Sequence, residues 1–178
     1  MSKQAAHKRH ARRRAGRGAA TGSGEQRLVV LGRARSAVAL ARQEASALGS
    51  PATGTEHLLL GLLRQDDGPA SEALNSLGIS AVAVRGRVEG VSDQVSALGV
   101  ASGRRPTTAA GAPMTPRGRE ALEQSLREAV RLGDGYLGVE HLLLALLRDR
   151  DGGATRTLRA LGVEPERVEA RLEQVIGR

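Results

Sequence analysis

The hydrophobic positions of this chain follow one pattern twice. Residues 54–64 and 138–148 each combine a glycine, a glutamate–histidine pair and a run of leucines, and the two stretches differ at two of eleven positions. The register of 84 residues between them holds from about residue 31 to residue 91. A register held over that length indicates an internal duplication rather than chance similarity between two helices.

The spacing of apolar residues predicts four helices in the first copy. Between about residues 28 and 48 they recur at i, i+3, i+4 and i+7, which is typical of an amphipathic helix. The next helix, at about 55–64, is apolar on most sides after its first turn, so we expect it at the centre of its repeat. Two shorter patterns predict further helices at about 70–77 and 81–95.

The second copy opens at Thr115-Pro116, with the threonine as N-cap and the proline in the first turn. Its helices are expected at about 116–132, 139–148, 153–161 and 165–176. No segment alternates strictly between apolar and polar residues, so we expect no sheet. One four-helix unit of this size buries only a marginal core, so we expect the two copies to pack against each other with pseudo-twofold symmetry. The predicted fold class is all-α, with eight helices in two four-helix repeats.

Composition divides the chain into four segments. We expect residues 1–26 to be a disordered basic tail, 27–98 the first repeat, 99–113 a linker and 114–178 the second repeat, with 27–178 forming one compact domain. The absence of cysteine excludes disulfides and thiolate metal ligands, which suits a reducing compartment such as the cytoplasm. No apolar run approaches the ~20 residues that span a bilayer, so we expect no membrane partner.

The net charge of +8 belongs to the N-terminal tail. Residues 1–24 hold seven basic residues and no acidic one, which leaves the rest of the chain close to neutral. A block of like charge binds nucleic acid without sequence specificity, so a nucleic-acid-associated protein is one alternative, and a solubilising extension is the other interpretation of the tail. The near absence of aromatic residues removes the stacking platforms of single-strand binders. The tail residues expected to contact nucleic acid are Lys8, Arg9, Arg12, Arg13 and Arg14.

No catalytic constellation is evident. The sequence has no G-x-x-x-x-G-K-[ST] phosphate loop and no serine in a G-x-S-x-G context, so we expect no ATP hydrolysis, no other enzymatic activity and no cofactor. His57 and His141 each have one neighbouring glutamate, which is not the spacing of a metal-binding pair. We interpret both histidines as packed, hydrogen-bonded residues at helix starts.

The duplicated pattern strongly resembles the Clp repeat, the N-terminal domain of AAA+ unfoldases of the ClpA/ClpC/ClpB group. In that family the domain is an all-α double repeat at the entrance of a hexameric unfoldase, where it docks adaptors and some substrates. The resemblance implies a non-catalytic binding module whose partners are a Clp unfoldase, its adaptors or its marked client proteins. It covers about residues 28–177 and is carried by Leu48-Gly49, Gly54-Thr55-Glu56-His57-Leu58-Leu59, Leu77-Gly78-Ile79, Thr115-Pro116-Arg117, Leu132-Gly133, Gly138-Val139-Glu140-His141-Leu142-Leu143 and Leu161-Gly162-Val163.

In ClpC-type members the domain binds phosphoarginine, the degradation mark on client proteins, at two equivalent sites. Each site uses the glutamate of the Gly-Thr-Glu-His motif, with a threonine and an arginine at the start of the repeat's first helix. In the first repeat Arg33 and Glu56 match, but Leu31 stands where the threonine would be. In the second repeat the resemblance indicates a site formed by Thr115, Arg117 and Glu140.

The chemistry of these residue types fits that ligand. A carboxylate such as that of Glu140 accepts hydrogen bonds from a guanidinium in a fork, and an N-cap hydroxyl with free N–H groups receives a phosphate. A carboxylate in the first turn also stabilises its helix through the dipole by ~0.3–1 kcal/mol, so the glutamates have a purely structural interpretation as well. The sequence leaves three roles open: an adaptor that delivers clients, a decoy that competes for them, or a remnant without a ligand.

Overall fold

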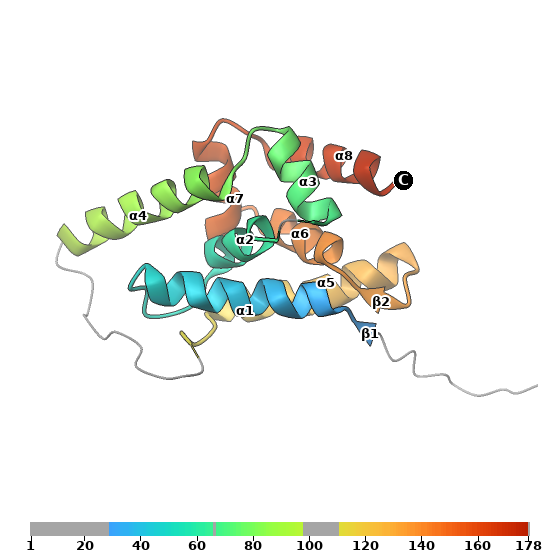
Figure 1. Cartoon of the computed structure of the whole chain (residues 1–178), viewed down its shortest axis with the longest axis horizontal. Helices are drawn as coiled ribbons and strands as arrows, with labels where there is room; N and C mark the ends of the chain where they lie inside the picture. The colour runs from blue at the N-terminus through green and yellow to red at the C-terminus, as the bar shows by residue number, and fades with distance from the viewer. Residues whose placement is uncertain (1–28, 66, 98–110, 178) are drawn as a thin grey trace, which may run out of the picture.

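A computed structural model of the chain describes residues 29–65, 67–97 and 111–177, with the side chains of 91–97 left out of the description. The predicted tail and most of the predicted linker lie outside these residues. The described residues form eight helices and two short strands (Figure 1). In chain order they are β1 (Val29–Val30), α1 (Gly32–Ala47), α2 (Thr55–Leu63), α3 (Pro69–Ser76), α4 (Ala81–Ala97), α5 (Pro116–Leu132), β2 (Tyr136–Leu137), α6 (Val139–Arg148), α7 (Gly153–Ala160) and α8 (Pro165–Ile176).

The prediction that the chain contains no sheet is wrong. Strand β1 pairs in parallel with β2, and the Leu31 N–H extends the ladder by donating to the Leu137 carbonyl at 3.0 Å. Helix α1 consequently begins at Gly32 rather than near residue 28. Strands of two residues are too short for a period-2 pattern to reveal them.

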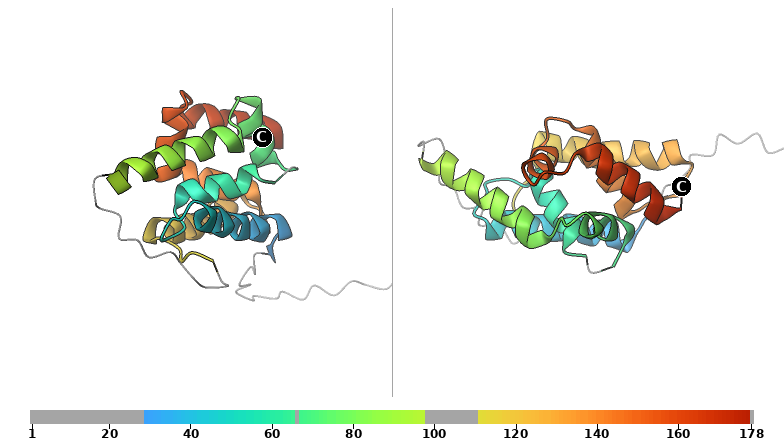
Figure 2. Two further views of the ribbon diagram at one scale, coloured as in Figure 1. Left: turned by 60° about the vertical axis from the view of Figure 1, so that its left-hand side comes forward. Right: turned by 90° about the horizontal axis from the view of Figure 1, so that it is seen from above.

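The two repeats pack against each other with α2 and α6 at the centre (Figure 1). Helices α1 and α5 lie along one side of this pair, while α3, α4, α7 and α8 lie on the other (Figures 1 and 2). Contacts between the repeats come in equivalent sets: α2 with α7 and α6 with α3, α1 with α6 and α5 with α2, α4 with α7 and α8 with α3. This exchange confirms the predicted pseudo-twofold packing of two four-helix repeats.

Aliphatic side chains from both repeats build one continuous core. Helices α2 and α6 are buried along nearly their whole length, as their leucine-rich pattern predicts. None of the described helices is long and apolar enough to cross a membrane. The largest fully buried side chains are Leu58, Leu59, Leu60, Leu62, Leu74, Leu142, Leu143, Leu146, Leu158, Leu172, His141 and Val84.

The repeats differ in how closely their first two helices approach. A Cβ built on Gly61 would lie 2.1 Å from the carbonyl oxygen of Ala37 and 2.9 Å from the backbone nitrogen of Ala41. The α1 backbone therefore rests directly on α2, whereas the second repeat accommodates Ala145 at the equivalent position.

Candidate functional site

The two motif glutamates occupy equivalent places in the first turns of α2 and α6. Each carboxylate folds back over the glycine that precedes its helix. A Cβ built on Gly54 would lie 2.2 Å from Oε1 of Glu56, and one built on Gly138 would lie 2.3 Å from Oε1 of Glu140. A larger residue at either N-cap would require the carboxylate to move away from its present position.

The motif histidines fix these helix starts. The Gly54 N–H donates to Nδ1 of His57 at 3.0 Å, and the Gly138 N–H donates to Nδ1 of His141 at 3.0 Å. A nitrogen that accepts a hydrogen bond carries no proton, so the proton of each neutral ring is on Nε2. Both rings are buried, which confirms the prediction that they are packed, hydrogen-bonded residues.

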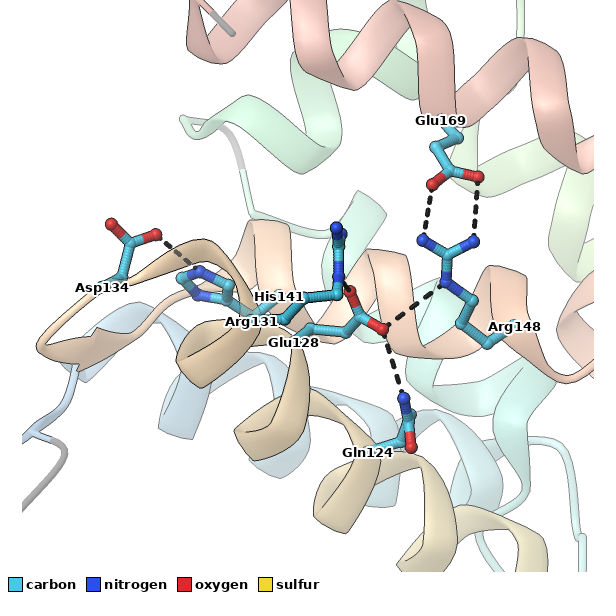
Figure 3. Close-up of polar contacts among 7 residues, drawn as sticks. All are labelled: Gln124, Glu128, Arg131, Asp134, His141, Arg148 and Glu169. Carbon is cyan, nitrogen blue, oxygen red and sulfur yellow. Dashed lines mark hydrogen bonds and ion pairs between the residues drawn. The ribbon is translucent and has the colours of Figure 1, made fainter.

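The Nε2 atoms meet different partners in the two repeats. That of His57 lies 3.1 Å from Oγ of Ser50, while that of His141 lies 2.9 Å from Oδ2 of Asp134 (Figure 3). Hydrogen bonding to a carboxylate orients His141 more strongly than a hydroxyl orients His57. Among the residues that the structure describes, no group of three or more histidine or acidic side chains is placed to hold a metal ion.

Glu56 lies at the start of two helices from different repeats. A Cβ built on Gly153, the first residue of α7, would lie 2.0 Å from Oε2 of Glu56. Next to it, Oγ1 of Thr55 accepts from the Ala154 N–H at 3.2 Å. The Thr55 hydroxyl of the first repeat thus caps a helix of the second repeat, and the Glu56 carboxylate lies at the same helix start, where the helix dipole favours negative charge.

Electrostatics keep Glu56 ionised. Burial raises the pKa of Glu56, but the hydrogen bond and positive charge of a protonated His57, a backbone N–H and the positive charge of Arg156 lower it by more, so the pKa lies below its ordinary value. Oε1 of Glu56 is 3.1 Å from Nδ1 of His57, which accepts from the main chain while the ring is neutral. Glu56 and Arg156 also line a small cavity of about 150 Å³.

Glu140 has different surroundings. Val139 stands where the first repeat has a threonine, and Pro69 opens α3 where a glycine opens α7. A Cβ built on Gly68 would lie 3.4 Å from Cγ2 of Val139 and 3.6 Å from Nη1 of Arg33. Apolar contact therefore replaces the hydroxyl cap on this side. The Glu140 side chain is also less exposed than that of Glu56, at 10% against 27%.

Thr115 caps α5 as its position before a proline predicts. Its Oγ1 accepts from the Gly118 N–H at 2.9 Å. Its own N–H donates to the carbonyl of Thr53 at 2.9 Å, just before α2. Thr115 therefore lies next to the helix start that carries Glu56.

Arg117 and Arg33 each contact the turn between the second and third helices of their own repeat. Nη1 of Arg117 lies 2.6 Å from Oδ1 of Asp149, and this hydrogen bond and charge raise the pKa of Arg117. Nη1 of Arg33 donates to the carbonyl of Asp67 at 3.2 Å. Leu31, which stands in place of the expected threonine, makes no side-chain cap on α1.

The candidate residues have neighbours in both repeats. Asp149 follows the last residue of α6, so its ion pair holds Arg117 at the opposite end of α6 from Glu140. At ~1.5 Å per residue, Glu140 and Asp149 are ~13 Å apart along the helix axis. Arg33 of the first repeat approaches the same glycine turn as Val139, beside Glu140. Thr115 therefore lies near the helix start of the first repeat, and Arg33 lies near Gly68, which packs against Val139 of the second repeat.

Sequence reasoning missed a second pair of buried carboxylates. Glu44 and Glu128 occupy equivalent positions near the ends of α1 and α5. Nη1 of Arg64 lies 2.8 Å from Glu44, and Arg85 binds the other oxygen of the same carboxylate. The available signal was that the Glu44 and Arg64 pair recurs in register as Glu128 and Arg148.

The carboxylate of the second repeat has a different set of partners (Figure 3). Nε of Arg131 lies 2.8 Å from Glu128, Gln124 donates to it at 3.2 Å, and Nε of Arg148 lies at 3.5 Å. Arg148 also binds Glu169 of α8 at 2.8 Å. Burial raises the pKa of Glu128, but Arg131, Gln124 and Arg148 lower it by more than burial raises it, so the pKa lies below its ordinary value.

An open groove of about 950 Å³ runs between α1 and α5. Its lining combines aliphatic side chains from both helices with charged residues at its walls. A feature built by one helix from each repeat has no signature in the pattern of either repeat alone. The lining residues include Val38, Leu122, Leu126, Arg35, Arg42 and Glu123.

Comparison with known proteins gives a consistent family match. The sequence pattern of the Clp repeat (R) N-terminal domain matches residues 32–111 and 113–178. The chaperone protein ClpB of Oceanobacillus iheyensis is 39% identical over 145 residues, and the negative regulator of genetic competence ClpC/MecB of Bacillus subtilis is 37% identical over 145 residues. Each alignment covers 82% of this chain but only 17% of the relative, so the chain spans a small part of the length of these proteins.

Solved structures share the fold. The N-terminal domain of the caseinolytic protease associated chaperone ClpD from Arabidopsis thaliana has a TM-score of 0.65 at 24% identity, covering 83% of this chain and 96% of that domain. The Hsp104 N-terminal domain from Candida albicans has a TM-score of 0.61 at 12% identity, covering 84% and 92%. Sequence identities this low establish similarity of fold only.

Proposed function

Because the chain belongs to the family of Clp repeat N-terminal domains, we propose that it is a non-catalytic docking module for clients or adaptors of a Clp unfoldase. The observation that carries the proposal is the duplicated carboxylate at the starts of α2 and α6, placed where the two repeats meet. A carboxylate held over a glycine N-cap is oriented in advance for a cationic group. Preorganisation of this kind lowers the cost of ordering on binding.

Phosphoarginine is the ligand that we propose for these positions. A guanidinium of the ligand would donate to Glu56 or Glu140, and its phosphate would meet an arginine and helix N–H groups. Arg156 of α7 stands beside Glu56, and Arg33 stands on the side of Glu140. We therefore propose two composite sites, each drawing on both repeats.

The grouping of Thr115, Arg117 and Glu140 indicated by the family resemblance makes a competing proposal. In that grouping Arg117 must leave Asp149 before it can reach a ligand at Glu140. The two groupings predict that different substitutions weaken ligand binding. Binding attributed to Glu140 falls with Arg33→Ala in the composite site, and with Arg117→Ala in the site confined to the second repeat.

The test is calorimetric titration of the whole chain with free phosphoarginine. Glu56→Gln and Glu140→Gln keep the size of each side chain and remove its charge, so each is expected to abolish one of two binding events. Arg127→Gln removes a charge from an exposed position on α5 and serves as a control. Absence of both heat and a thermal shift at millimolar ligand would refute the phosphoarginine site.

The role of the module is a separate question from its ligand. A complex with a Clp unfoldase in a pull-down supports an adaptor that delivers clients. Ligand binding without any such complex supports a decoy that competes for them. If the chain binds neither a ligand nor an unfoldase, it is a remnant of the duplicated fold without a ligand.

Nucleic-acid binding is a second candidate function, favoured by the seven basic residues among residues 1–24. These residues lie outside the part of the chain that the structure describes. Binding of this kind weakens steeply as salt increases, because phosphate contacts release counterions. Salt-sensitive DNA binding that disappears when residues 1–24 are deleted would support it, and DNA binding that survives the deletion would contradict it.

A further inference from the structure

A cavity of about 400 Å³ lies between the end of α2 and the start of α4. Its lining combines the aliphatic side chains of Leu60, Ala81 and Val82 with the guanidinium groups of Arg64 and Arg85. Leu60 is buried, whereas Val82 is 82% exposed. The cavity therefore joins an apolar surface to two cations.

Both arginines bind the same buried carboxylate. Nη1 of Arg64 and Nη2 of Arg85 each contact one oxygen of Glu44. Glu89 lies 3.9 Å from Nη1 of Arg85, which is longer than a hydrogen bond, and it does not line the cavity. Among the described residues, the two guanidinium groups therefore share one lining carboxylate, and one positive charge is in excess.

The second repeat shows what the equivalent arginine binds. Arg148 corresponds to Arg64, and it binds Glu169 of α8 through Nη2 at 2.8 Å and Nη1 at 3.5 Å. The first repeat has Arg85 at the position of Glu169. A second cation thus stands where the second repeat supplies a carboxylate from its own last helix.

The start of α4 adds to the positive potential of the two arginines. Its first turn contains no acidic residue, whereas α8 has Glu164 at its N-cap and Glu166 in its first turn. The N-terminus of a helix favours negative charge. Val82 takes the place of Glu166, so the first repeat lacks this compensating charge as well.

We propose that this cavity binds a carboxylate with a short aliphatic body. Arg64 binds the carboxylate through the N–H groups that Glu44 leaves unused, as its counterpart in the second repeat binds Glu169. Arg85 supplies the second positive charge. The aliphatic body contacts the apolar lining and releases water from the exposed Val82.

This site is separate from the proposed phosphoarginine sites. Neither Glu56 nor Glu140 lines the cavity. Glu56→Gln and Glu140→Gln should therefore leave carboxylate binding unchanged. Failure of one proposal can be distinguished in this way from failure of the other.

The experiment titrates the isotope-labelled whole chain with pentanoate and with its neutral analogue pentanamide, followed by NMR. Pentanoate should shift the amide signals of Arg64 and Val82 and should bind about tenfold more tightly than pentanamide, because hydrogen bonds between charged groups are stronger. The peptide acetyl-alanyl-glutamyl-alaninamide carries the same group on a polypeptide. Tighter binding of the peptide assigns the carboxylate to a protein side chain, and tighter binding of pentanoate assigns it to a free small molecule.

A substitution at the edge of the cavity tests the site while Glu44 keeps both arginines. Val82→Glu copies Glu166 of α8 and adds a carboxylate that competes for Arg64. It should weaken pentanoate by about tenfold or more, with circular dichroism showing that the helices persist. Arg167→Gln removes an exposed charge from α8 outside the cavity and should leave pentanoate binding unchanged.

A double variant copies the polar partners of the second repeat. Arg85→Glu introduces the residue equivalent to Glu169, and Ala47→Arg introduces the equivalent of Arg131, which compensates the buried carboxylate there. The combined variant should remain folded and lose the preference for pentanoate over pentanamide.

Four outcomes would overturn the proposal. The first two are equal affinity for pentanoate and pentanamide, and no saturable shifts with pentanoate or the peptide at high millimolar concentration. The third is an equal effect of Val82→Glu and Arg167→Gln. The fourth is a gain in pentanoate affinity in Asp66→Asn, because Asp66 lies outside the described residues and such a gain would assign the cavity to the chain's own carboxylate.

Discussion

Replacing Gly61 by alanine has two opposite effects on the free energy of unfolding, and the two differ in size. In a helix interior alanine is favoured over glycine by about 1 kcal/mol. At this position the new Cβ would lie 2.1 Å from the carbonyl oxygen of Ala37, an atom of the α1 backbone rather than a flexible side chain. Relief requires α1 to move away from α2 by about 1 Å, and overpacking of a core usually costs about 1–3 kcal/mol or more.

Two features put Gly61→Ala at the costly end of that range. The contacts include the Ala41 backbone nitrogen at 2.9 Å as well, so a small rotation cannot relieve both. Shifting α1 also opens the packing of fully buried alanines along the interface. We expect net destabilisation of about 2 kcal/mol after the gain in helix propensity, measured as a lower urea midpoint with an unchanged m-value.

A matched control separates the clash from the chemistry of the substitution. Gly86 lies in α4, exposed, and a Cβ there meets nothing within 4 Å. Gly86→Ala is expected to raise stability by up to about 1 kcal/mol through helix propensity alone. If Gly61→Ala were as stable as the wild-type chain while Gly86→Ala behaved as expected, the close approach of α1 and α2 would be refuted.

Two further predictions concern the repeat interface and its carboxylates. Thr55→Val removes the acceptor of the Ala154 N–H and should lower the free energy of unfolding by about 1 kcal/mol. Thr157→Val, within the capped helix α7, should change it by less than about 0.5 kcal/mol, and equal effects would contradict the cap. Because the pKa values of Glu56 and Glu128 lie below 4.5, the stability that they contribute is present above that pH and is lost as pH falls through their folded values. The Glu128→Gln variant should therefore lose less stability than the wild-type chain between neutral and acidic pH in urea titrations, and an unchanged pH profile would exclude the effect.

Helix patterns in this sequence were informative because each repeat contains strong local signals. The proline at residue 116 and the leucine runs of α2 and α6 placed most helix ends within a residue or two. The β1–β2 pair escaped prediction because it is made by four residues more than a hundred positions apart. Nothing in Val29 or Tyr136 alone specifies that partner.

The sequence pattern indicated which residue types form the candidate site, and their grouping stays a prediction. The resemblance identified Glu56 and Glu140, which the structure places in equivalent helix starts. Glu56 also lies beside Gly153 of the other repeat, a contact that the pattern of one repeat does not reveal, and the grouping of site residues stays a prediction. Arg117, for example, is close to Glu140 in sequence and is held at the far end of α6 by Asp149.

The buried carboxylates show how the two halves diverged under a physical constraint. A buried charge needs partners, and losing one leaves an uncompensated group that is strongly destabilising. In the first repeat Arg85 of α4 binds Glu44, but the equivalent residue of α8 is Glu169, which has the opposite charge. Arg131, which stands where the first repeat has an alanine, supplies Glu128 with the missing cation.

The same reasoning applies to the starts of α2 and α6. A hydroxyl caps α7 next to a carboxylate on one side, while on the other side a valine and a proline remove both the acceptor and one donor. Two glutamates that are equivalent in sequence therefore have different electrostatic surroundings. A cationic ligand should distinguish them, with the more exposed Glu56 open to exchange and the more enclosed Glu140 demanding a closer fit. The two motif glutamates thus have unlike surroundings on one pseudo-symmetric scaffold, so binding at each has to be measured separately.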